Sequence, residues 1–191
     1  GRSINLALSH RGWTALEEIG LSEEIQKIAI PMYGRTIHQL NGSVNFQPYG
    51  KDNQAIYSVS RGELNQKLVE LADRYPEIQF HFNHFCQKID LDNNVAYMLQ
   101  TNTNTELEVR ADWIIGTDGA FSRVRNSMMH IPRFQYQQFY IDYGYKELHI
   151  PSGEHNKYLL DKNSLHIWPR GRFMLIALPN IDGSFTCTLF I

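Results

Sequence analysis

Ile114-Ile115-Gly116-Thr117-Asp118-Gly119-Ala120-Phe121-Ser122-Arg123-Val124-Arg125 is the stretch of sequence on which the fold assignment depends. Apolar residues from Trp113 to Ile115 are typical of a strand end, and Asp118-Gly119 is typical of a tight turn. Ser122 then begins a polar helix. Glycine lets a backbone approach a ligand closely, and the N–H groups of a helix N-terminus favour anions. The stretch therefore predicts a phosphate or ribose site at the end of a buried strand, or an ordinary strand-to-helix turn.

The composition favours a soluble globular protein. The chain has 191 residues, of which 42% are hydrophobic and 20% charged, and its net charge is -2. These values are typical of one domain or two small ones, and they give no basic surface for nucleic acid. No apolar run is long enough to span a membrane. Cys86 and Cys187 are too few for a disulfide framework and indicate a reducing compartment.

Hydrophobic spacing predicts helices and strands mixed in the first part of the chain and mostly strands in the tail. Helices are expected after Ser9 and from Ser22, and Ser60 with Glu63 forms a capping box for a third. Asn41-Gly42 predicts a hairpin. The expected strands are 2–8, 35–40, 44–48, 56–59, 78–82, 95–99, 107–109, 113–115, 139–150, 165–168, 173–178 and 185–191.

Metal and hydrolase chemistry find little support. His81, His84 and Cys86 are close in sequence, but on a strand His81 and His84 would project from opposite faces. Structural or surface histidines are the better interpretation, and we expect no metal site. No Gly-x-Ser-x-Gly elbow is present.

Arg35 and Arg61 are candidate ligand-binding residues because of their positions in the sequence. Arg35 lies on an otherwise apolar strand, and Tyr49 follows on the next one. A buried guanidinium needs an anion, either a neighbouring carboxylate, which the sequence alone favours, or a ligand carboxylate supported by the tyrosine hydroxyl. Arg61 begins a helix, where a cation opposes the macrodipole. Either a bound phosphate or flavin removes that conflict, or solvent exposure weakens it.

One set of residues in the tail is expected to share a side of successive strands. Core packing is the default interpretation, although the slightly polar Thr188 would also suit an aromatic ligand pocket. The set consists of Leu165, Met174, Ile176, Leu178, Thr188 and Phe190.

Taken together, the segments resemble the kynurenine 3-monooxygenase branch of the flavin-dependent aromatic hydroxylases. The resemblance covers essentially the whole chain, and the run from Leu165 to Asn180 is its most specific part. The matching stretches are Gly1-Arg2-Ser3-Ile4-Asn5-Leu6-Ala7-Leu8-Ser9, Ile30-Pro31-Met32, Gly34-Arg35 with Ile37-His38, Pro48-Tyr49-Gly50, Ser58-Val59-Ser60-Arg61, His81-Phe82-Asn83-His84, Gly116 with Asp118-Gly119-Ala120, Leu165-His166-Ile167-Trp168-Pro169-Arg170, Ile176-Ala177-Leu178-Pro179-Asn180 and Ser184-Phe185-Thr186-Cys187-Thr188-Leu189-Phe190.

The resemblance implies an FAD- and NADPH-dependent monooxygenase of tryptophan degradation and NAD biosynthesis. NADPH would reduce FAD, O₂ would give a flavin C4a-hydroperoxide, and its distal oxygen would hydroxylate L-kynurenine to 3-hydroxykynurenine. No residue of the chain need act as a general base, because the amino group of kynurenine already activates its ring. The alternatives are a related hydroxylase of another aromatic acid and a non-catalytic truncated piece.

The resemblance also assigns roles to residues of this chain. Arg35 and Tyr49 match the positions that hold the substrate carboxylate, and the six tail residues match the aromatic pocket. The residues that match FAD contacts, or lie beside them, are Ala7, Arg61, Cys86, Asp118, Gly119 and Arg123.

The implied fold is α/β, with an FAD-binding Rossmann-like part of the p-hydroxybenzoate-hydroxylase type and a substrate-side mixed or antiparallel β-sheet. Residues 1–30 and 59–130 would belong to the FAD-binding domain, and residues 31–58 and 131–191 to the substrate-binding domain. The chain lacks an initial methionine and the Gly-x-Gly-x-x-Gly segment that grips FAD pyrophosphate. We therefore expect an internal piece, incomplete at both ends, that does not hold FAD alone. A cytoplasmic location is expected, or the mitochondrial outer membrane if a eukaryotic C-terminal anchor follows.

Overall fold

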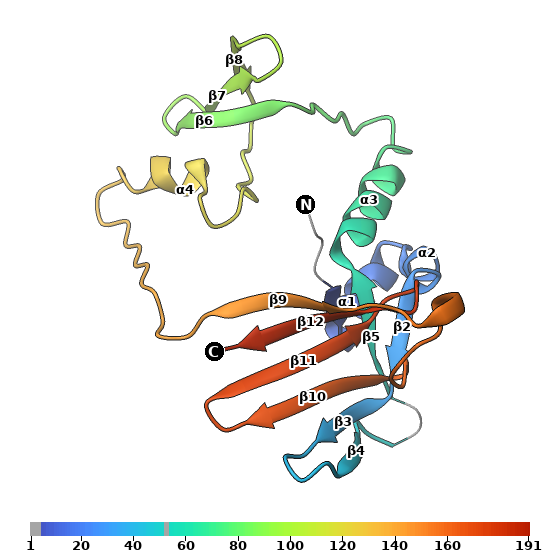
Figure 1. Ribbon diagram of the computed structural model, residues 1–191. Helices are drawn as coiled ribbons and strands as arrows, with labels where there is room; N and C mark the ends of the chain where they lie inside the picture. The colour runs from blue at the N-terminus through green and yellow to red at the C-terminus, as the bar shows by residue number, and fades with distance from the viewer. Residues whose placement is uncertain (1–4, 52–53) are drawn as a thin grey trace. The chain divides into compact units, whose positions relative to one another are not determined.

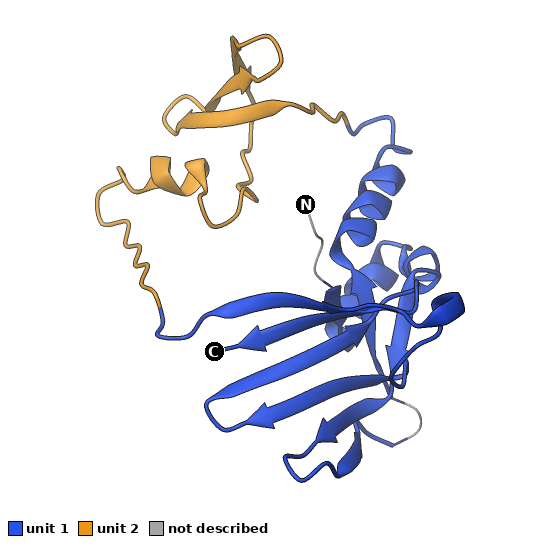
Figure 2. Ribbon diagram, viewed as in Figure 1, with its two compact units in different colours: residues 1–78, 141–191 blue, residues 79–140 orange. Residues whose placement is uncertain are grey.

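The computed structural model describes residues 5–51 and 54–191, which form two compact units (Figures 1 and 2). One unit contains residues 1–78 and 141–191, and the other contains residues 79–140. The division into FAD-binding and substrate-binding domains remains a prediction, because the compactness of a backbone does not report what it binds.

The first unit contains a three-stranded antiparallel sheet with helices at its strand ends. The strand order is β1 (Asn5–Leu8), β5 (Ile56–Ser60) and β2 (Ala29–Met32), and the helices are α1 (His10–Glu18), α2 (Ser22–Gln26) and α3 (Arg61–Ala72). The expected capping of α3 is confirmed, because the Ser60 hydroxyl accepts a hydrogen bond from the Glu63 N–H at 3.4 Å. Strand β2, which contains Pro31, is not among the expected strands.

The same unit contains a six-stranded mixed sheet. Its order is β4 (Val44–Pro48), β3 (Gly34–His38), β10 (Ser164–Arg170), β11 (Phe173–Pro179), β12 (Phe185–Phe190) and β9 (Tyr145–Ile150), and a 3-10 turn, η1 (Glu154–Asn156), follows β9. Strands β3 and β10 pair in parallel, while the other neighbours are antiparallel. The predicted hairpin at Asn41-Gly42 joins β3 to β4. Ala177, Phe185 and Cys187 form a buried cluster, against which Tyr158, Leu160, Trp168 and Leu175 pack.

The second unit contains a three-stranded antiparallel sheet and one short helix. The strands are β6 (His84–Asp90), β7 (Val95–Gln100) and β8 (Thr105–Arg110), and the helix is α4 (Arg123–Met128). The Ser127 hydroxyl joins the helix to the sheet, because it accepts from the Ile89 N–H at 2.9 Å and donates to the Arg123 carbonyl at 3.1 Å.

Two expected strands are wrong. Residues 78–82 pair with no described strand, and β6 begins only after Asn83, whose φ of 60° turns the backbone. The segment from Trp113 to Ile115 is not a strand either, and those two side chains are 86% and 84% exposed. A strand requires a hydrogen-bonded neighbour, and in the described chain these apolar runs have none. For the same reason, β9 begins at Tyr145 rather than at Phe139.

Candidate functional site

The register of the six-stranded sheet brings the predicted substrate residues to one face. Arg35 lies directly opposite Leu165, and Ile167 lies opposite Ile176. Directly opposed side chains share a face, and side chains alternate along each strand. The pairs Met174–Phe190 and Ile176–Thr188 extend the same face across β11 and β12. Arg35 therefore shares its face with the whole predicted set of Leu165, Met174, Ile176, Leu178, Thr188 and Phe190.

This face is distinct from the one that carries the core. Ala177 and Cys187 alternate with the predicted residues and belong to the buried cluster. Leu178 is 6% exposed, but Met174 and Phe190 are each 37% exposed. The predicted set is therefore not simply part of the described core, and its outer end offers apolar surface to a ligand or to another part of the protein.

Arg35 was expected to be buried and paired with an anion, and the structure shows neither among the described residues. Its side chain is exposed, so the predicted buried guanidinium is wrong. No carboxylate in the described ranges forms an ion pair with it, and its guanidinium carbon lies 5.2 Å from the centroid of the Tyr49 ring. The neighbouring-carboxylate alternative therefore finds no partner in residues 5–51 and 54–191.

Tyr49 is half-buried, and its hydroxyl group lies inside the protein. Its hydroxyl oxygen is buried and has no hydrogen-bond partner among the described residues. Burial raises the pKa of Tyr49, and the nearby Arg35 guanidinium opposes that rise. A neutral phenol beside a cation is a suitable pair for a carboxylate, because both groups can donate hydrogen bonds to it.

Ala7 and Arg61 lie on the smaller sheet and its helix. Ala7 is directly opposite Ser58, and Asn5 is opposite Ser60, so these four side chains share a face. Arg61 is the first residue of α3 and is exposed. Solvent therefore relieves the conflict between its charge and the helix macrodipole in this structure.

Side chains of the Asp-Gly turn and of Ser122 accept hydrogen bonds from the first N–H groups of α4. The Asp118 carboxylate accepts from the Ser122 hydroxyl at 2.6 Å and from the N–H groups of Arg123 at 2.6 Å and Val124 at 3.3 Å. The Ser122 hydroxyl in turn accepts from the Arg125 N–H at 2.9 Å. The hydrogen bond from Ser122 is the main cause that lowers the pKa of Asp118. The expectation of helix N–H groups free to bind a phosphate is therefore wrong.

Four predicted cofactor residues nevertheless gather around this turn. Gly119 has a φ of 76°, and no atom lies within 4 Å of the place where a Cβ would stand. The Arg123 guanidinium lies 5.5 Å from the Phe85 ring, beside Cys86. Burial raises the pKa of the Cys86 thiol, and Asp118 raises it further.

The groups at this turn suit the ribose of FAD better than its pyrophosphate. The exposed Asp118 carboxylate can accept from a hydroxyl, the open side of Gly119 permits close approach, and Arg123 supplies a cation. These groups suit a ribose, while the occupied N–H groups of α4 do not suit the pyrophosphate. The turn therefore fits the sugar portion of a dinucleotide.

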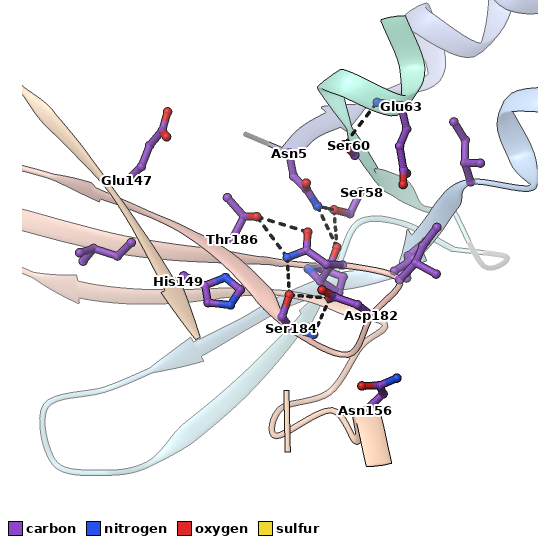
Figure 3. A pocket seen from close by; sticks show the side chains of 16 residues that line it. Asn5, Ser58, Ser60, Glu63, Glu147, His149, Asn156, Asp182, Ser184 and Thr186 are labelled. Carbon is purple, nitrogen blue, oxygen red and sulfur yellow. Dashed lines mark hydrogen bonds between the residues drawn. The ribbon is translucent and has the colours of Figure 1, made fainter. Parts of the chain in front are cut away.

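A polar cavity of about 720 Å³ in the first unit was missed by sequence reasoning (Figure 3). Within its lining, the Asn5 amide donates to the Ser58 hydroxyl at 2.8 Å and to the Pro179 carbonyl at 3.0 Å. The next residue along the chain, Asn180, donates from its side-chain amide to the Ser184 hydroxyl at 2.8 Å. Its lining also includes the carboxylates of Glu63, Glu147 and Asp182 and the imidazole of His149.

The cavity adjoins predicted residues although none of them lines it. Thr186 belongs to its lining and lies directly opposite Leu178, and Ser58 lies directly opposite Ala7. Three carboxylates make the cavity unfavourable for a phosphate. Its residues come from segments far apart in the chain, so no spacing in the sequence signals it.

Residues 5–51 and 54–191 offer neither a metal site nor a membrane-spanning helix. No cluster of three or more His, Cys, Asp or Glu residues with metal-binding geometry occurs there. The rings of His81 and His84 lie 5.8 Å apart, edge to face. No helix of that part has the length and apolar character needed to cross a membrane.

Comparison with known proteins places these observations in context. A profile described as FAD binding domain matches residues 6–167. The chain is 48% identical over 191 residues to kynurenine 3-monooxygenase of Christiangramia forsetii, covering 100% of this chain and 42% of that protein. It is 53% identical over 190 residues to kynurenine 3-monooxygenase of Dictyostelium discoideum, covering 99% of this chain and 40% of that protein. The chain thus spans about two fifths of the length of these curated relatives.

Solved structures share the fold at low sequence identity. Tetrameric 2-methyl-3-hydroxypyridine-5-carboxylic acid oxygenase aligns with a TM-score of 0.74 at 18% identity, covering 100% of this chain and 48% of that one. p-Nitrophenol 4-monooxygenase PnpA from Pseudomonas putida aligns with a TM-score of 0.77 at 16% identity, covering 98% of this chain and 47% of that one. The expected mixed α/β fold is confirmed.

Proposed function

Because the chain belongs to the FAD binding domain family, we propose that the protein carrying it is an FAD- and NADPH-dependent monooxygenase that converts L-kynurenine to 3-hydroxykynurenine, in tryptophan degradation and NAD biosynthesis. The relatives named kynurenine 3-monooxygenase, at 41–53% identity, support this substrate. The observation that carries the proposal is the gathering of Arg35 and the six predicted pocket residues on one face of a sheet, with Tyr49 beside Arg35.

The substrate carboxylate is proposed to bind at the edge of this face. The Arg35 guanidinium presents two N–H groups in a fork that matches a carboxylate, and the unpaired Tyr49 hydroxyl donates a third hydrogen bond. The exposed position of Arg35 leaves it accessible to a small acid. The aromatic ring then lies on the apolar part of the face, over Ile176 and Leu178.

The residues proposed to contact FAD are Ala7, Arg61, Cys86, Asp118, Gly119 and Arg123. When bound, FAD would supply the reducing electrons for O₂ and the transfer of one oxygen atom to the ring. The residues of this chain orient the ring and exclude water from it. None is needed as a general base, because the ring carries its own electron-donating amino group.

Replacing Arg35 tests the proposal. Arg35→Met in the protein that carries this chain removes a charge-assisted pair worth about 1.5–3 kcal/mol, so the KM for L-kynurenine should rise about 10- to 150-fold. Arg172→Met, which changes an exposed arginine in the turn between β10 and β11, is the matched control and should leave KM unchanged. An unaltered KM in Arg35→Met would remove Arg35 from the substrate site.

Two further measurements separate the alternatives. Turnover of L-kynurenine and of simple hydroxybenzoates distinguishes a kynurenine hydroxylase from a relative acting on another aromatic acid. The flavin absorbance of the purified chain tests whether this stretch holds FAD by itself, and a colourless protein is expected. A cytoplasmic location is proposed because two cysteines are too few for a disulfide framework, and cell fractionation tests it.

A further inference from the structure

Two histidines join β3 to β10 on the face opposite to Arg35. The His38 Nε2 and His166 Nδ1 atoms lie 2.9 Å apart, and His166 Nε2 lies 2.8 Å from the Asp161 carbonyl oxygen. His166 is only 2% exposed. Trp168 stacks on His38 at 4.3 Å between ring centroids, and the Phe185 ring meets His166 edge to face at 5.7 Å.

The surroundings determine where the protons of this pair lie. A carbonyl oxygen can only accept, so His166 Nε2 carries a hydrogen. The neutral His166 ring then has a bare Nδ1, which accepts from the His38 Nε2–H. A proton added to His38 Nδ1 leaves this hydrogen bond in place, and a protonated His166 Nδ1 can instead donate to a neutral His38 whose hydrogen lies on Nδ1. Only when both rings are charged do two N–H groups face each other at 2.9 Å. The link is therefore lost only when both rings are protonated.

The charged and titratable groups around the pair come from three segments. Burial lowers the pKa of His38, and His166 and the Arg170 guanidinium lower it further. Burial also lowers the pKa of His166, and Asp161, on the loop before β10, opposes this with a weaker effect. Arg170 additionally donates to the His38 carbonyl at 2.9 Å.

The parallel ladder between β3 and β10 is short, and the position of Arg35 depends on it. Figure 1 shows β3 beside β10. Four residue pairs make up the register of the two strands, from Gly34–Ser164 to Ile37–Ile167. A second side-chain link on the same face as the histidines joins the Thr36 and Ser164 hydroxyls at 2.5 Å. A slip of one residue would turn Arg35 to the wrong face. Every residue of β4, on the outer side of β3, is exposed, so β4 adds little rigidity of its own.

We propose that His38 and His166 are positioning residues for the substrate carboxylate: their neutral hydrogen-bonded pair holds β3 against β10, and so keeps Arg35 on the ring-binding face. Protonation of both rings loosens β3 and weakens carboxylate binding. This inference rests on the proposed function, because it concerns the same carboxylate. It assigns no contact with substrate to either histidine.

The test compares two variants of His38 in the protein that carries this chain. His38→Gln retains an N–H donor near the position of Nε2 but does not titrate, while His38→Leu removes the donor. His10→Leu, at an exposed histidine at the start of α1, is the matched control. The readout is the Kd of L-kynurenine and of its decarboxylated amine analogue, measured by flavin difference spectra at about pH 8 and about pH 5.

The expected results separate positioning from simple structural damage. In the unaltered protein, the Kd of L-kynurenine should rise as the pH falls, and that of the amine should change less. His38→Leu should raise the Kd of L-kynurenine about tenfold at the higher pH and spare the amine. His38→Gln should restore tight binding and flatten its pH dependence. An equal loss of both ligands in His38→Leu, or an unchanged pH dependence in His38→Gln, would overturn the proposal.

Failure of the proposed function gives a different result. If the unaltered protein binds neither ligand, or does not distinguish them, the substrate assignment is wrong. The ¹⁵N shifts of His166 report the hydrogen on Nε2 independently of any ligand. A spectrum that instead shows the hydrogen on Nδ1 would refute the inferred link, whatever the substrate.

Discussion

Replacing Tyr49 by phenylalanine should change folding stability and ligand affinity in opposite directions. The Tyr49 hydroxyl is buried without a hydrogen-bond partner in the described chain. An unsatisfied buried hydroxyl costs about 1–3 kcal/mol, and phenylalanine removes that cost while leaving the ring beside Arg35. Tyr49→Phe should therefore raise the free energy of unfolding by about 1 kcal/mol or more.

The effect on binding follows from the same atom. In the proposed complex, the hydroxyl donates to a charged carboxylate, and such a bond contributes about 1.5–3 kcal/mol. The Kd of L-kynurenine should therefore rise at least about tenfold. Denaturant unfolding gives the first quantity and a flavin difference spectrum the second. Tyr143→Phe, at a tyrosine that is 70% exposed, is the control and should change neither. A destabilised Tyr49→Phe protein with unaltered Kd would refute both the orphaned hydroxyl and its role.

Three further predictions concern stability. Gly116→Ala would put a Cβ 2.8 Å from Val124 Cβ, so overpacking should lower the unfolding free energy of the second unit by about 1–3 kcal/mol, measured by urea denaturation. Asp118→Ala should cost about 0.5–2 kcal/mol, because the N–H groups of Arg123 and Val124 at the start of α4 lose their acceptor. Since the pKa of Asp118 is lowered, its contribution should be present at neutral pH and should fade as the pH falls through that lowered pKa. His166 has its pKa lowered by burial from an ordinary value of 6.5, so the unfolded chain takes up the proton first. The free energy of unfolding should therefore be highest above about pH 6.5, and below it His166 should lower this free energy by up to about 1.4 kcal/mol per pH unit. His166→Asn should remove this part of the slope and leave the part due to His38, whose pKa is also lowered.

Signals that act within a few residues predicted their elements correctly. The capping box of Ser60 and Glu63 starts α3, and Asn41-Gly42 makes the hairpin, because each depends on neighbouring backbone alone. Alternation also placed the residues of β11 on the correct sides, since a strand paired on both edges keeps its period.

Features that depend on residues far apart in the chain could not be predicted from the sequence. The apolar run at Trp113 to Ile115 has the composition of a strand, but a strand exists only where another lies beside it. His38 and His166 are separated by 128 positions, so their hydrogen bond has no local signature. Arg35 was expected to be buried, yet alternation turns the adjacent Gly34 and Thr36 inward and leaves Arg35 on the other, exposed face.

The two faces of the six-stranded sheet have different roles: one holds the strands together, and the other is open to a ligand. On one face, the Ala177–Phe185–Cys187 cluster, the hydroxyl pair and the histidine pair hold the strands in register. On the other, Arg35 and the apolar residues remain open to a ligand. Because side chains alternate, a substitution on the binding face can alter affinity without removing a register contact. A substitution at His38 or His166, by contrast, acts on Arg35 only through the backbone of β3. It should therefore weaken the binding of a ligand with a carboxylate more than the binding of the same ligand without one.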